Sequence, residues 1–362
     1  MSERQPQKEL NGCAASLCAW FEEGQRHLPW RIEPTPYRVW VSEIMLQQTR
    51  IEAVLGYFER FMRELPTVQA LAEVDPDRLM KLWEGLGYYS RARNLQKAAR
   101  QIVSEYGGEL PADYDALKGL AGIGEYTAGA IASIAFGIPV PAVDGNVLRV
   151  LARLTGCERD VMNGAVRREL TALAASLVPT DRPGTFNQAL MELGERVCLP
   201  NTMPRCEHCP VAYACAVAGS ERAAALPVRA PKKPRRIEER TVYVLLTKGT
   251  PGAVLLHKRE DNGLLAGLWE LPNTLRTSAY TLPVAGMRRV SDWLPLPESR
   301  HIFSHIEWHM NGVLALVEPC ELPEGYAFCD EAALMRDRAL PTAFRAYAHM
   351  LPTWLNQSPT KG

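Results

Sequence analysis

The sequence lacks the features of a membrane-spanning or secreted protein. No stretch is apolar and long enough to span a bilayer, and the first residues, MSERQPQKEL, contain no apolar core of signal-peptide length. Its nine cysteines do not resemble a disulfide framework, because four are clustered and the others are scattered: Cys13, Cys18, Cys157, Cys320 and Cys329. We therefore expect a cytoplasmic protein with no membrane partner.

The chain also lacks net charge of either sign. Its 41 Lys and Arg residues balance 41 Asp and Glu residues, so a nucleic-acid surface would have to come from local asymmetry. One basic stretch stands out between residues 226 and 239, where prolines alternate with basic side chains: Arg229, Lys232, Lys233, Arg235 and Arg236 with Pro227, Pro231 and Pro234. Because proline disfavours helix, this stretch is predicted to be an extended basic linker.

A chain of 362 residues favours two domains, and the apolar pattern changes at this linker. Before it, apolar residues recur at helical spacing, as in residues 51–62 and 147–154. After it, short apolar runs at 241–247 and 253–259 flank a Gly- and Pro-containing turn, which is typical of strands. The predicted fold is an all-helical domain over residues 1–225, the linker over 226–239, and a mixed α/β domain over 240–362.

Four cysteines follow a C-x7-C-x2-C-x5-C spacing: Cys198, Cys206, Cys209 and Cys215. Thiolates this close together need a Lewis-acidic partner to stay deprotonated, so the pattern predicts a metal or iron–sulfur site around which the segment folds. Two disulfides or four ordinary buried cysteines are the alternatives, and the interleaved prolines disfavour them. Spacing alone leaves both zinc and a 4Fe-4S cluster open.

A glycine turn leads into a small-residue helical segment at residues 117–131. Gly122 and Gly124 would let backbone N–H groups at the helix start approach an anion closely, where the helix dipole also favours negative charge. These features are typical of a helix-hairpin-helix that binds a DNA phosphate independently of base sequence. A simple packing corner between two helices is the alternative.

Two carboxylates stand out in the helical half. Glu43 lies among apolar residues that would desolvate it, which raises a carboxyl pKa and suits proton donation. Asp144 lies at a glycine break just before a helical run, where backbone N–H groups would keep it ionised, although a plain helix N-cap is the favoured interpretation of an isolated Asp-Gly-Asn. A buried acid beside an ionised carboxylate cleaves glycosidic bonds, and a target base in DNA would first have to leave the stack.

These segments, in this order, resemble the helix-hairpin-helix superfamily of DNA glycosylases, and within it the adenine DNA glycosylases of the MutY family. The matching stretches are VWVSEIMLQQTR, GLGYYSRARNL, LAGIGEYTAGAIA, AVDGNVLRVLAR, ALMELG and the cysteine cluster. The resemblance implies that the four cysteines hold one 4Fe-4S cluster. The first cysteine interval is seven residues here, where six is usual in the family.

The resemblance also implies the chemistry. Relatives similar to endonuclease III carry a strand-nicking lysine after the residue that matches Glu125, but this chain has Tyr126, which implies a monofunctional enzyme that leaves an abasic site. Glu43 would protonate N7 of adenine and Asp144 would stabilise the cationic sugar. The other implied roles are positioning by Asn146 and Tyr126, an adenine pocket formed by Arg31 and Glu192, and filling of the duplex by Gln48 and Tyr88.

The C-terminal half resembles the Nudix-like domain that recognises 8-oxoguanine in this family, with Ser304 and His305 at a predicted hairpin tip as the implied readers. An ordinary β-turn is the alternative. The segment Trp269–Pro272 is similar to the start of a Nudix motif, but the downstream magnesium-binding glutamates are missing, so pyrophosphohydrolase activity is not expected.

The expected function is removal of adenine mispaired with 8-oxoguanine or guanine in double-stranded DNA, by a monomer at the bacterial nucleoid. A strand-nicking thymine or oxidised-pyrimidine glycosylase is an alternative that Tyr126 disfavours. A catalytically silent DNA-binding protein or iron–sulfur redox sensor is another, and the presence of both Glu43 and Asp144 disfavours it.

Overall fold

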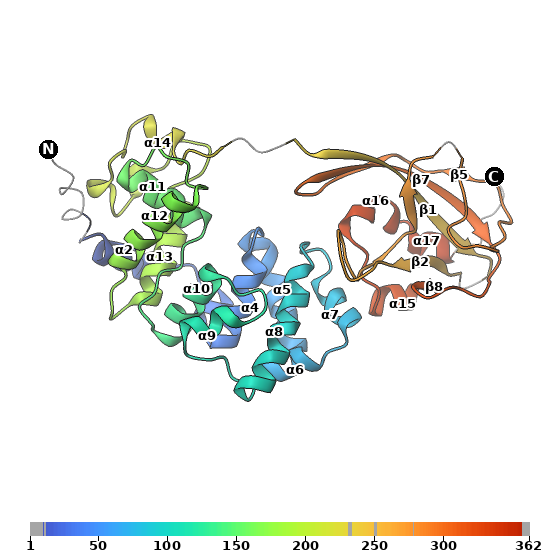
Figure 1. The fold of residues 1–362 in the computed structure, drawn as a ribbon, viewed down its shortest axis with the longest axis horizontal. Coiled ribbons are helices and arrows are strands. Elements are labelled where there is room, and N and C mark those ends of the chain that lie inside the picture. Colours follow the sequence, from blue (N-terminus) through green and yellow to red (C-terminus); the bar gives the residue numbers. More distant parts are fainter. Residues whose placement is uncertain (1–9, 11, 231–233, 250–251, 278, 357–362) are drawn as a thin grey trace. The chain divides into compact units, whose positions relative to one another are not determined.

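The computed structural model describes residues 10, 12–230, 234–249, 252–277 and 279–356 (Figure 1). Its contacts divide the chain into two compact units, one of Met1–Glu73 with Asn94–Lys232 and the other of Val74–Arg93 with Lys233–Gly362. The division near residue 232 falls in the predicted linker, whose Pro231, Lys232 and Lys233 lie outside the described residues. The grouping of Val74–Arg93 with the C-terminal residues was not predicted from the sequence.

The first unit is helical, as predicted. Apolar residues on one side of each helix are buried: in α5, for example, Ile51, Val54, Phe58 and Phe61 face the interior. The helices of this unit are α2 (Cys13–Gly24), α3 (Pro29–Ile32), α4 (Pro36–Leu46), α5 (Ile51–Glu64), α6 (Val68–Glu73), α8 (Ser90–Tyr106, whose first residues belong to the second unit), α9 (Tyr114–Gly119), α10 (Glu125–Phe136), α11 (Gly145–Thr155), α12 (Gly164–Leu177), α13 (Pro183–Arg196) and α14 (Arg222–Ala225), with short 3-10 turns η1 (Cys206–His208) and η2 (Ala212–Ala214). No described helix has the length and apolarity needed to cross a bilayer.

The helices α2, α11, α12 and α13 share one hydrophobic core, which includes Leu17, Leu151, Leu170 and Phe186. The cysteine loop that follows α13 packs against this same core through Cys198, Cys209 and Cys215. The loop is therefore held by the helical scaffold, and it does not form a separate small domain.

A close backbone approach fixes the segment that leads to Asp144. Gly129 in α10 lies so near this segment that a Cβ atom there would stand 2.2 Å from the carbonyl oxygen of Pro141. The buried side chain of Asn187 accepts a hydrogen bond from the Ala142 N–H (2.9 Å) and donates to the Val140 carbonyl oxygen (2.9 Å). Only glycine permits this packing, and the packing determines where the chain delivers Asp144 to the start of α11.

The second unit is built on a mixed sheet, as predicted, with residues 241–247 and 254–258 as paired antiparallel strands. The described strands form one sheet in the order β3-β2-β1-β7-β5, with β4 on β1, β6 on β7 and β8 on β2. Its elements are α7 (Pro76–Trp83), β1 (Arg236–Thr247), β2 (Val254–Lys258), β3 (Trp269–Glu270), β4 (Asn273–Leu275), β5 (Leu294–Pro295), β6 (Ser299–Ile302), β7 (Ile306–Val317), β8 (Tyr326–Cys329), α15 (Glu331–Arg336), η3 (Thr342–Phe344), α16 (Arg345–Ala348) and α17 (Leu351–Asn356).

The centre of the sheet is the parallel pair β1 and β7, which are in register from Arg236 opposite Ile306 to Thr247 opposite Val317. Alternate residues of β1 point to opposite faces: Val242, Val244 and Leu246 pack with the C-terminal helices, and Tyr243 and Leu245 pack on the other face. Both faces are covered, which explains the continuous apolar run in this strand. Strand β1 begins at Arg236, inside the stretch expected to be linker, because Arg236 and Arg240 pair with Glu238 and the backbone pairs with β7.

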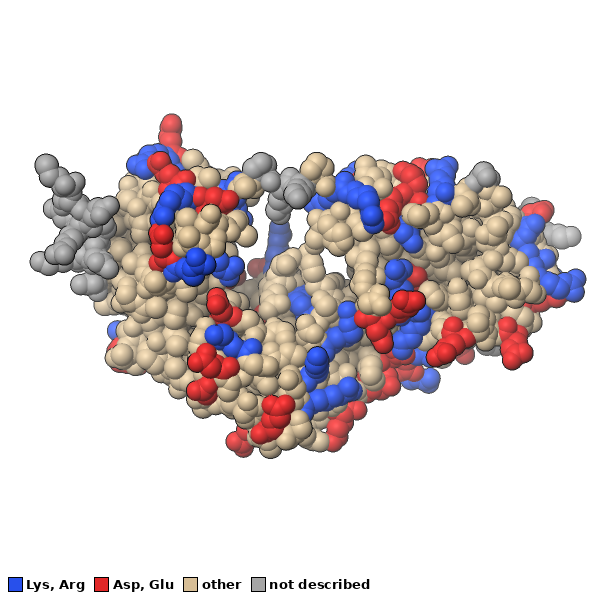
Figure 2. Space-filling model, in the orientation of Figure 1, with Lys and Arg blue, Asp and Glu red and all other residues tan. Residues whose placement is uncertain are grey.

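Charged side chains of both signs are interspersed on the face drawn in Figure 2, in keeping with the absence of net charge. This face therefore presents no broad patch of a single sign among the described residues (Figure 2).

The close approach at Gly129 gives a stability test. Gly129→Ala should destabilise the protein by about 1–3 kcal/mol, because the added methyl group forces α10 away from the Pro141 carbonyl. Gly56→Ala is the matched control: this exposed position in α5 has open space around it, so alanine should stabilise the helix by up to about 1 kcal/mol. Thermal unfolding midpoints measure both. If Gly129→Ala unfolds at the wild-type temperature, the backbone contact does not constrain the fold.

Candidate active site

A cavity of about 1040 Å³ lies in the first unit. It is lined by residues of several helices, and these include seven that the sequence predicted for the site: Arg31, Glu43, Gln48, Tyr126, Asp144, Asn146 and Glu192. Gly124, predicted to contact phosphate, also lines it. Glu43 and Asp144 therefore line the same cavity. A cavity of this size is large enough for an extruded nucleotide.

Glu43 lies near the end of α4, where apolar neighbours bury it to 6% exposure. Burial raises the pKa of Glu43 to about 7, even though a hydrogen bond from Tyr126 acts in the opposite direction. The nearby carboxyl of Asp144 adds to this rise. A substantial share of Glu43 is therefore protonated at neutral pH, as a general acid must be.

Tyr126 is the direct partner of Glu43. It lies in the first turn of α10, and its hydroxyl donates to Oε2 of Glu43 across 2.6 Å. The pKa of Tyr126 is raised well above its ordinary value by burial and by the neighbouring carboxylates, so the phenol stays protonated and keeps donating. The hydrogen bond fixes the orientation of the acid within the cavity.

Asp144 is both a helix cap and a cavity residue. It is the N-cap of α11, and its Oδ1 accepts a hydrogen bond from the Val147 N–H across 2.7 Å. Such bonds were expected from the sequence to keep Asp144 ionised. Instead burial raises the pKa of Asp144, and the backbone N–H groups of Val147 and Asn146 offset this only in part. The N–H donors favour the ionised form, but the desolvation of the partly buried carboxyl outweighs them.

Arg149 is a site residue that the sequence analysis missed. This arginine of α11 is 4% exposed, and it donates to Oδ1 of Asn146 (3.0 Å), the Gly194 carbonyl oxygen (2.8 Å) and the Cys198 carbonyl oxygen (2.8 Å). It therefore holds the cysteine loop, α13 and the residue two positions after Asp144 together. An arginine inside an otherwise apolar helix face was the signal that could have found it.

The predicted adenine pocket centres on Glu192 in α13, which is 1% exposed. Arg31 in α3 donates to its Oε2 (2.8 Å), and Arg26 makes two hydrogen bonds to it, of 2.6 and 2.7 Å. Arg26 was also missed by sequence reasoning. The pKa of Glu192 is lowered because these guanidinium groups outweigh its burial. Its carboxylate is thus ionised and already occupied by arginine donors.

One nitrogen of the Arg31 guanidinium makes no hydrogen bond to the described residues. This atom, Nη1, is buried, while Nη2 is committed to Glu192. An unpaired buried donor is costly unless a ligand satisfies it. Because this atom is itself buried, an acceptor could reach Arg31 Nη1 only if the side chain or its neighbours moved.

The predicted helix-hairpin-helix is present between α9 and α10. Gly122 has φ +76, and a Cβ atom there would stand 2.6 Å from the Cβ of Asn94, so glycine is required. Gly124 is the N-cap of α10 and has open space around it. The free N–H groups of α10 are thus accessible to an anion. Gln48 lies at the rim of the cavity, exposed and with φ +58.

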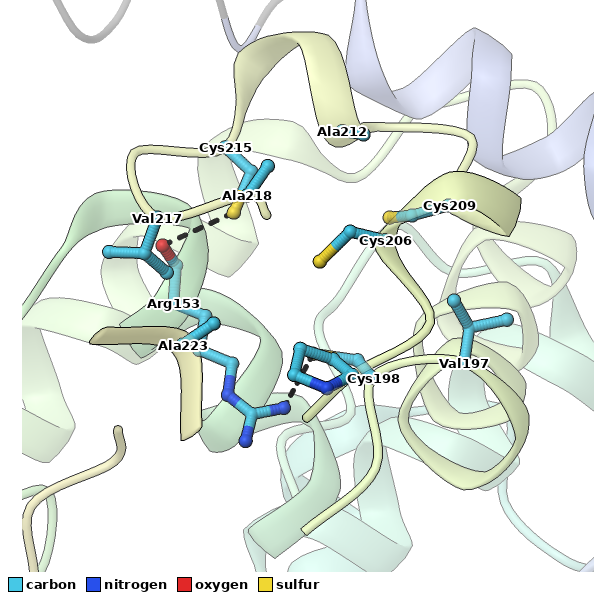
Figure 3. Close-up of a pocket in the computed structure, with 11 residues that line it drawn as sticks. Arg153, Val197, Cys198, Cys206, Cys209, Ala212, Cys215, Val217, Ala218 and Ala223 are labelled. Carbon is cyan, nitrogen blue, oxygen red and sulfur yellow. Dashed lines mark hydrogen bonds between the residues drawn. The ribbon is translucent and has the colours of Figure 1, made fainter. Parts of the chain in front are cut away.

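The four predicted cysteine ligands surround one small cavity of about 30 Å³, and the sulfurs of Cys206, Cys209 and Cys215 border the same space (Figure 3). Burial raises the pKa of Cys209 to about 11, so a bound cation would be needed to keep it as a thiolate. Arg153 Nη1 donates to Cys198 Sγ across 3.2 Å, which favours negative charge on the sulfur. Among the described residues, no group of three or more His, Cys, Asp or Glu side chains is arranged so that it could hold a single metal ion. Four cysteine sulfurs are nevertheless the kind of ligands that an iron–sulfur cluster or zinc takes.

Tyr88 belongs to the second unit, in a turn that follows α7. Its backbone has φ +47 and its side chain is 48% exposed. The buried Arg91 supports the turn: it donates to the carbonyl oxygens of Leu86 (3.2 Å) and Gly87 (3.1 Å), and its guanidinium lies 5.6 Å from the centre of the Tyr88 ring. An exposed aromatic ring held on a strained turn is suited to insertion into a stack of bases.

Ser304 and His305 lie at the tip of the β6–β7 hairpin, as predicted, and both are exposed. Phe303 anchors the tip by packing edge-on against the buried Trp308, with ring centres 4.9 Å apart. Backbone contacts tie the tip to the start of β1, where the Arg236 N–H donates to the His305 carbonyl oxygen (3.2 Å). Both side chains are therefore presented outward from a fixed backbone.

Comparison with known proteins agrees with this geometry. Residues 41–175 match the HhH-GPD superfamily of base excision DNA repair proteins, and residues 242–350 match the NUDIX domain. The rat adenine DNA glycosylase is 39% identical over 81% of this chain and 68% of its own length, and the mouse one is 40% identical over 83% and 69%. That of Buchnera aphidicola from Baizongia pistaciae is 31% identical over 83% of this chain and 85% of its own length.

Two solved structures each match more than half of this chain. A thermostable thymine-DNA glycosylase superposes with a TM-score of 0.52 and 27% identity over 58% of this chain and 96% of its own. Endonuclease III, in a noncovalent complex with DNA, gives 0.50 and 26% over 60% and 96%. This chain is therefore a base-excision DNA glycosylase and belongs to the adenine DNA glycosylase family, within the HhH-GPD superfamily.

Proposed function

We propose that this enzyme hydrolyses the N-glycosidic bond of adenine mispaired with 8-oxoguanine, or less readily with guanine, and leaves an abasic site without nicking the strand. The observation that supports this best is the pair of carboxyls in one cavity, with Glu43 buried, hydrogen-bonded to Tyr126 and with a pKa of about 7. Such an acid can protonate a leaving base at neutral pH.

The chemistry follows from the positions of these groups. Adenine leaves as a neutral base only if a ring nitrogen is protonated as the bond to the sugar breaks, and Glu43 supplies that proton, to N7. The sugar then carries positive charge, which the ionised form of Asp144 stabilises from its fixed place at the N-cap of α11. Water then adds to the sugar and loses a proton, which Glu43, ionised after protonating the base, can accept. Asn146, held by Arg149, lies in the lining of the cavity near Asp144.

The part of the cavity lined by arginine side chains is suited to bind adenine, whose ring nitrogens are hydrogen-bond acceptors. Glu192 accepts hydrogen bonds from Arg26 and Arg31 and so holds both guanidinium groups in the lining of the cavity, next to the space that the base would occupy. A hydrogen-bonding pocket of this kind discriminates strongly between bases, because a base without the matching acceptor leaves a buried donor unpaired.

A strand-nicking glycosylase for thymine or oxidised pyrimidines is the second candidate, in view of the structural similarity to a thymine-DNA glycosylase. Nicking of that kind requires an amine that attacks the sugar. The residues that line the described cavity include no lysine, and Tyr126 occupies the position next to Glu125. This composition favours the monofunctional reaction.

For recognition of the mispair, we propose that Ser304 and His305 contact the oxidised base, that Tyr88 and Gln48 fill the duplex, and that the N–H groups near Gly122 and Gly124 hold a backbone phosphate. The four cysteines, Cys198, Cys206, Cys209 and Cys215, would hold a 4Fe-4S cluster, whose part here is to stabilise the loop that Arg149 and Arg153 connect to α11.

Glu43→Gln tests the acid. The substitution should lower the single-turnover rate of adenine release by a factor of about 10² or more, since an amide cannot supply the proton, while duplex affinity stays near wild type. Glu52→Gln is the control, because Glu52 lines the same cavity but is exposed. Rates are measured on duplexes with adenine opposite 8-oxoguanine, guanine and thymine. Substantial excision by Glu43→Gln at neutral pH would overturn the assignment.

Metal analysis tests the cysteine site. Purified protein should contain about four irons per chain and absorb broadly in the visible range, and Cys206→Ser should reduce both, because one ligand is lost. Cys157→Ser is the control, since Cys157 lies outside the four-cysteine cavity. A colourless protein with stoichiometric zinc would contradict the cluster assignment.

A further inference from the structure

The helix α7 belongs to the second unit although it lies early in the sequence. It carries a carboxylate in its first turn and another at its C-cap, Asp77 and Glu84, and both bind groups from the last third of the chain. Neither residue was singled out by the sequence, and neither contributes to the cavity that holds Glu43.

Asp77 receives three donors from that part of the chain. Its Oδ1 accepts from Lys258 Nζ across 2.8 Å, and its Oδ2 accepts from Trp269 Nε1 and from Arg338 Nη1, each across 3.2 Å. The carboxylate is 18% exposed, so these are not solvent-screened surface pairs. One short acidic side chain thus connects β2, β3 and the segment after α15 to α7.

The donors are themselves packed together. Trp269 is 8% exposed, and its ring lies beneath two cations: Arg338 at 4.6 Å and Lys258 at 5.6 Å from the ring centre. Removal of Asp77 would leave these two positive charges adjacent with no described carboxylate between them. The arrangement is therefore specific for an acceptor at this position of α7.

The other end of α7 is fastened independently. Glu84 Oε1 accepts from the Leu340 N–H across 2.7 Å, and its Oε2 pairs with Lys81 across 2.7 Å. With both ends held, α7 can neither slide nor rotate against the sheet without breaking one of these contacts.

The turn that presents Tyr88 begins where α7 ends. Trp83, the last residue of α7, donates from Nε1 to the Gly87 carbonyl oxygen (3.2 Å), and the buried Arg91 holds the same oxygen (3.1 Å). The position of the Tyr88 ring is therefore set by α7, and α7 is set by Asp77 and Glu84. The hairpin tip with Ser304 and His305 belongs to this same unit.

We propose that Asp77 is a positioning residue for lesion discrimination: by fastening α7 to β2, β3 and the segment after α15, it makes the duplex-filling Tyr88 and the base-reading hairpin parts of one rigid body. When the hairpin binds 8-oxoguanine, Tyr88 is then brought at the same time to the position in which it fills the duplex. This inference rests on the proposed function of Tyr88, Ser304 and His305.

The test compares Asp77→Asn with Asp115→Asn. Asp115 is the matched control, because it also lies in the first turn of a short helix and pairs with a lysine, but that partner, Lys118, is on its own helix (3.3 Å). The first readout is the ratio of single-turnover rates for adenine opposite 8-oxoguanine and opposite guanine. The second is amide hydrogen exchange of residues 78–89 in the full-length protein, which does not depend on activity.

Asp77→Asn should lower the rate ratio by about fivefold or more, the lower end of typical couplings between sites, mainly through a slower reaction opposite 8-oxoguanine. Exchange in residues 78–89 should rise, Asp77→Glu should restore much of the ratio, and Asp115→Asn should change neither. The double variant Asp77→Asn with Lys258→Met should lower the rate ratio by less than the product of the two single fold-changes, because both substitutions break the same contact. His305→Ala is the positive control for a reduced ratio.

A wild-type ratio in Asp77→Asn, with unchanged exchange in residues 78–89, would overturn the inference. So would an equal loss of rate on both duplexes, since that indicates a purely structural role. If Asp77→Asn does not fold, Lys258→Met alone is scored by the same readouts, because it removes one of three donors. Failure of wild-type protein to release adenine from either duplex would instead overturn the proposed function, and the exchange data would still decide whether Asp77 fastens α7.

Discussion

The hydrogen bond between Tyr126 and Glu43 is the interaction on which the active site depends. It joins α10 to α4 across 2.6 Å inside a cavity that desolvates both groups. Burial alone would make Glu43 a still weaker acid, and the phenol limits this effect while it fixes the carboxyl in place. An acid with a pKa of about 7 is the compromise that proton donation at neutral pH requires.

The scaffold serves to bring a second carboxyl to the same cavity. Gly129 allows the backbone before Asp144 to approach α10, Asn187 ties that backbone down, and Arg149 holds the residues just after Asp144 to α13 and to the cysteine loop. The cysteine loop and the active site are thus connected through one buried guanidinium group, whose Nε donates to Cys198 and whose Nη2 donates to Asn146 and Gly194. A change in the loop that moves Arg149 would therefore displace Asn146, which lies two residues after Asp144.

Much of this was predictable from sequence because the signals are local. Apolar neighbours on both sides of Glu43 indicated its burial, glycines at 122 and 124 indicated the hairpin, and short apolar runs on either side of a turn indicated the strands of the mixed sheet. Long-range partners were not predictable in this way. Arg26 and Arg149 act through residues 45 or more positions away, and the grouping of α7 with the C-terminal sheet depends on Asp77 meeting Lys258, Trp269 and Arg338. The direction of the Asp144 pKa shift also depends on burial by parts of the chain that lie far away in the sequence, which no short segment reveals.

The pKa of Glu43 is the quantity that tests most directly whether this residue is a general acid. Carbon-13 NMR of protein labelled at glutamate carboxyls, with the Glu43 signal assigned by its loss in Glu43→Gln, gives this pKa without any assay of activity. We predict a titration centred near pH 7, with the protonated form persisting below it. A Glu43 carboxyl that titrates at about 4.3, the ordinary value for an exposed glutamate, would contradict the proposal that this cavity holds a general acid.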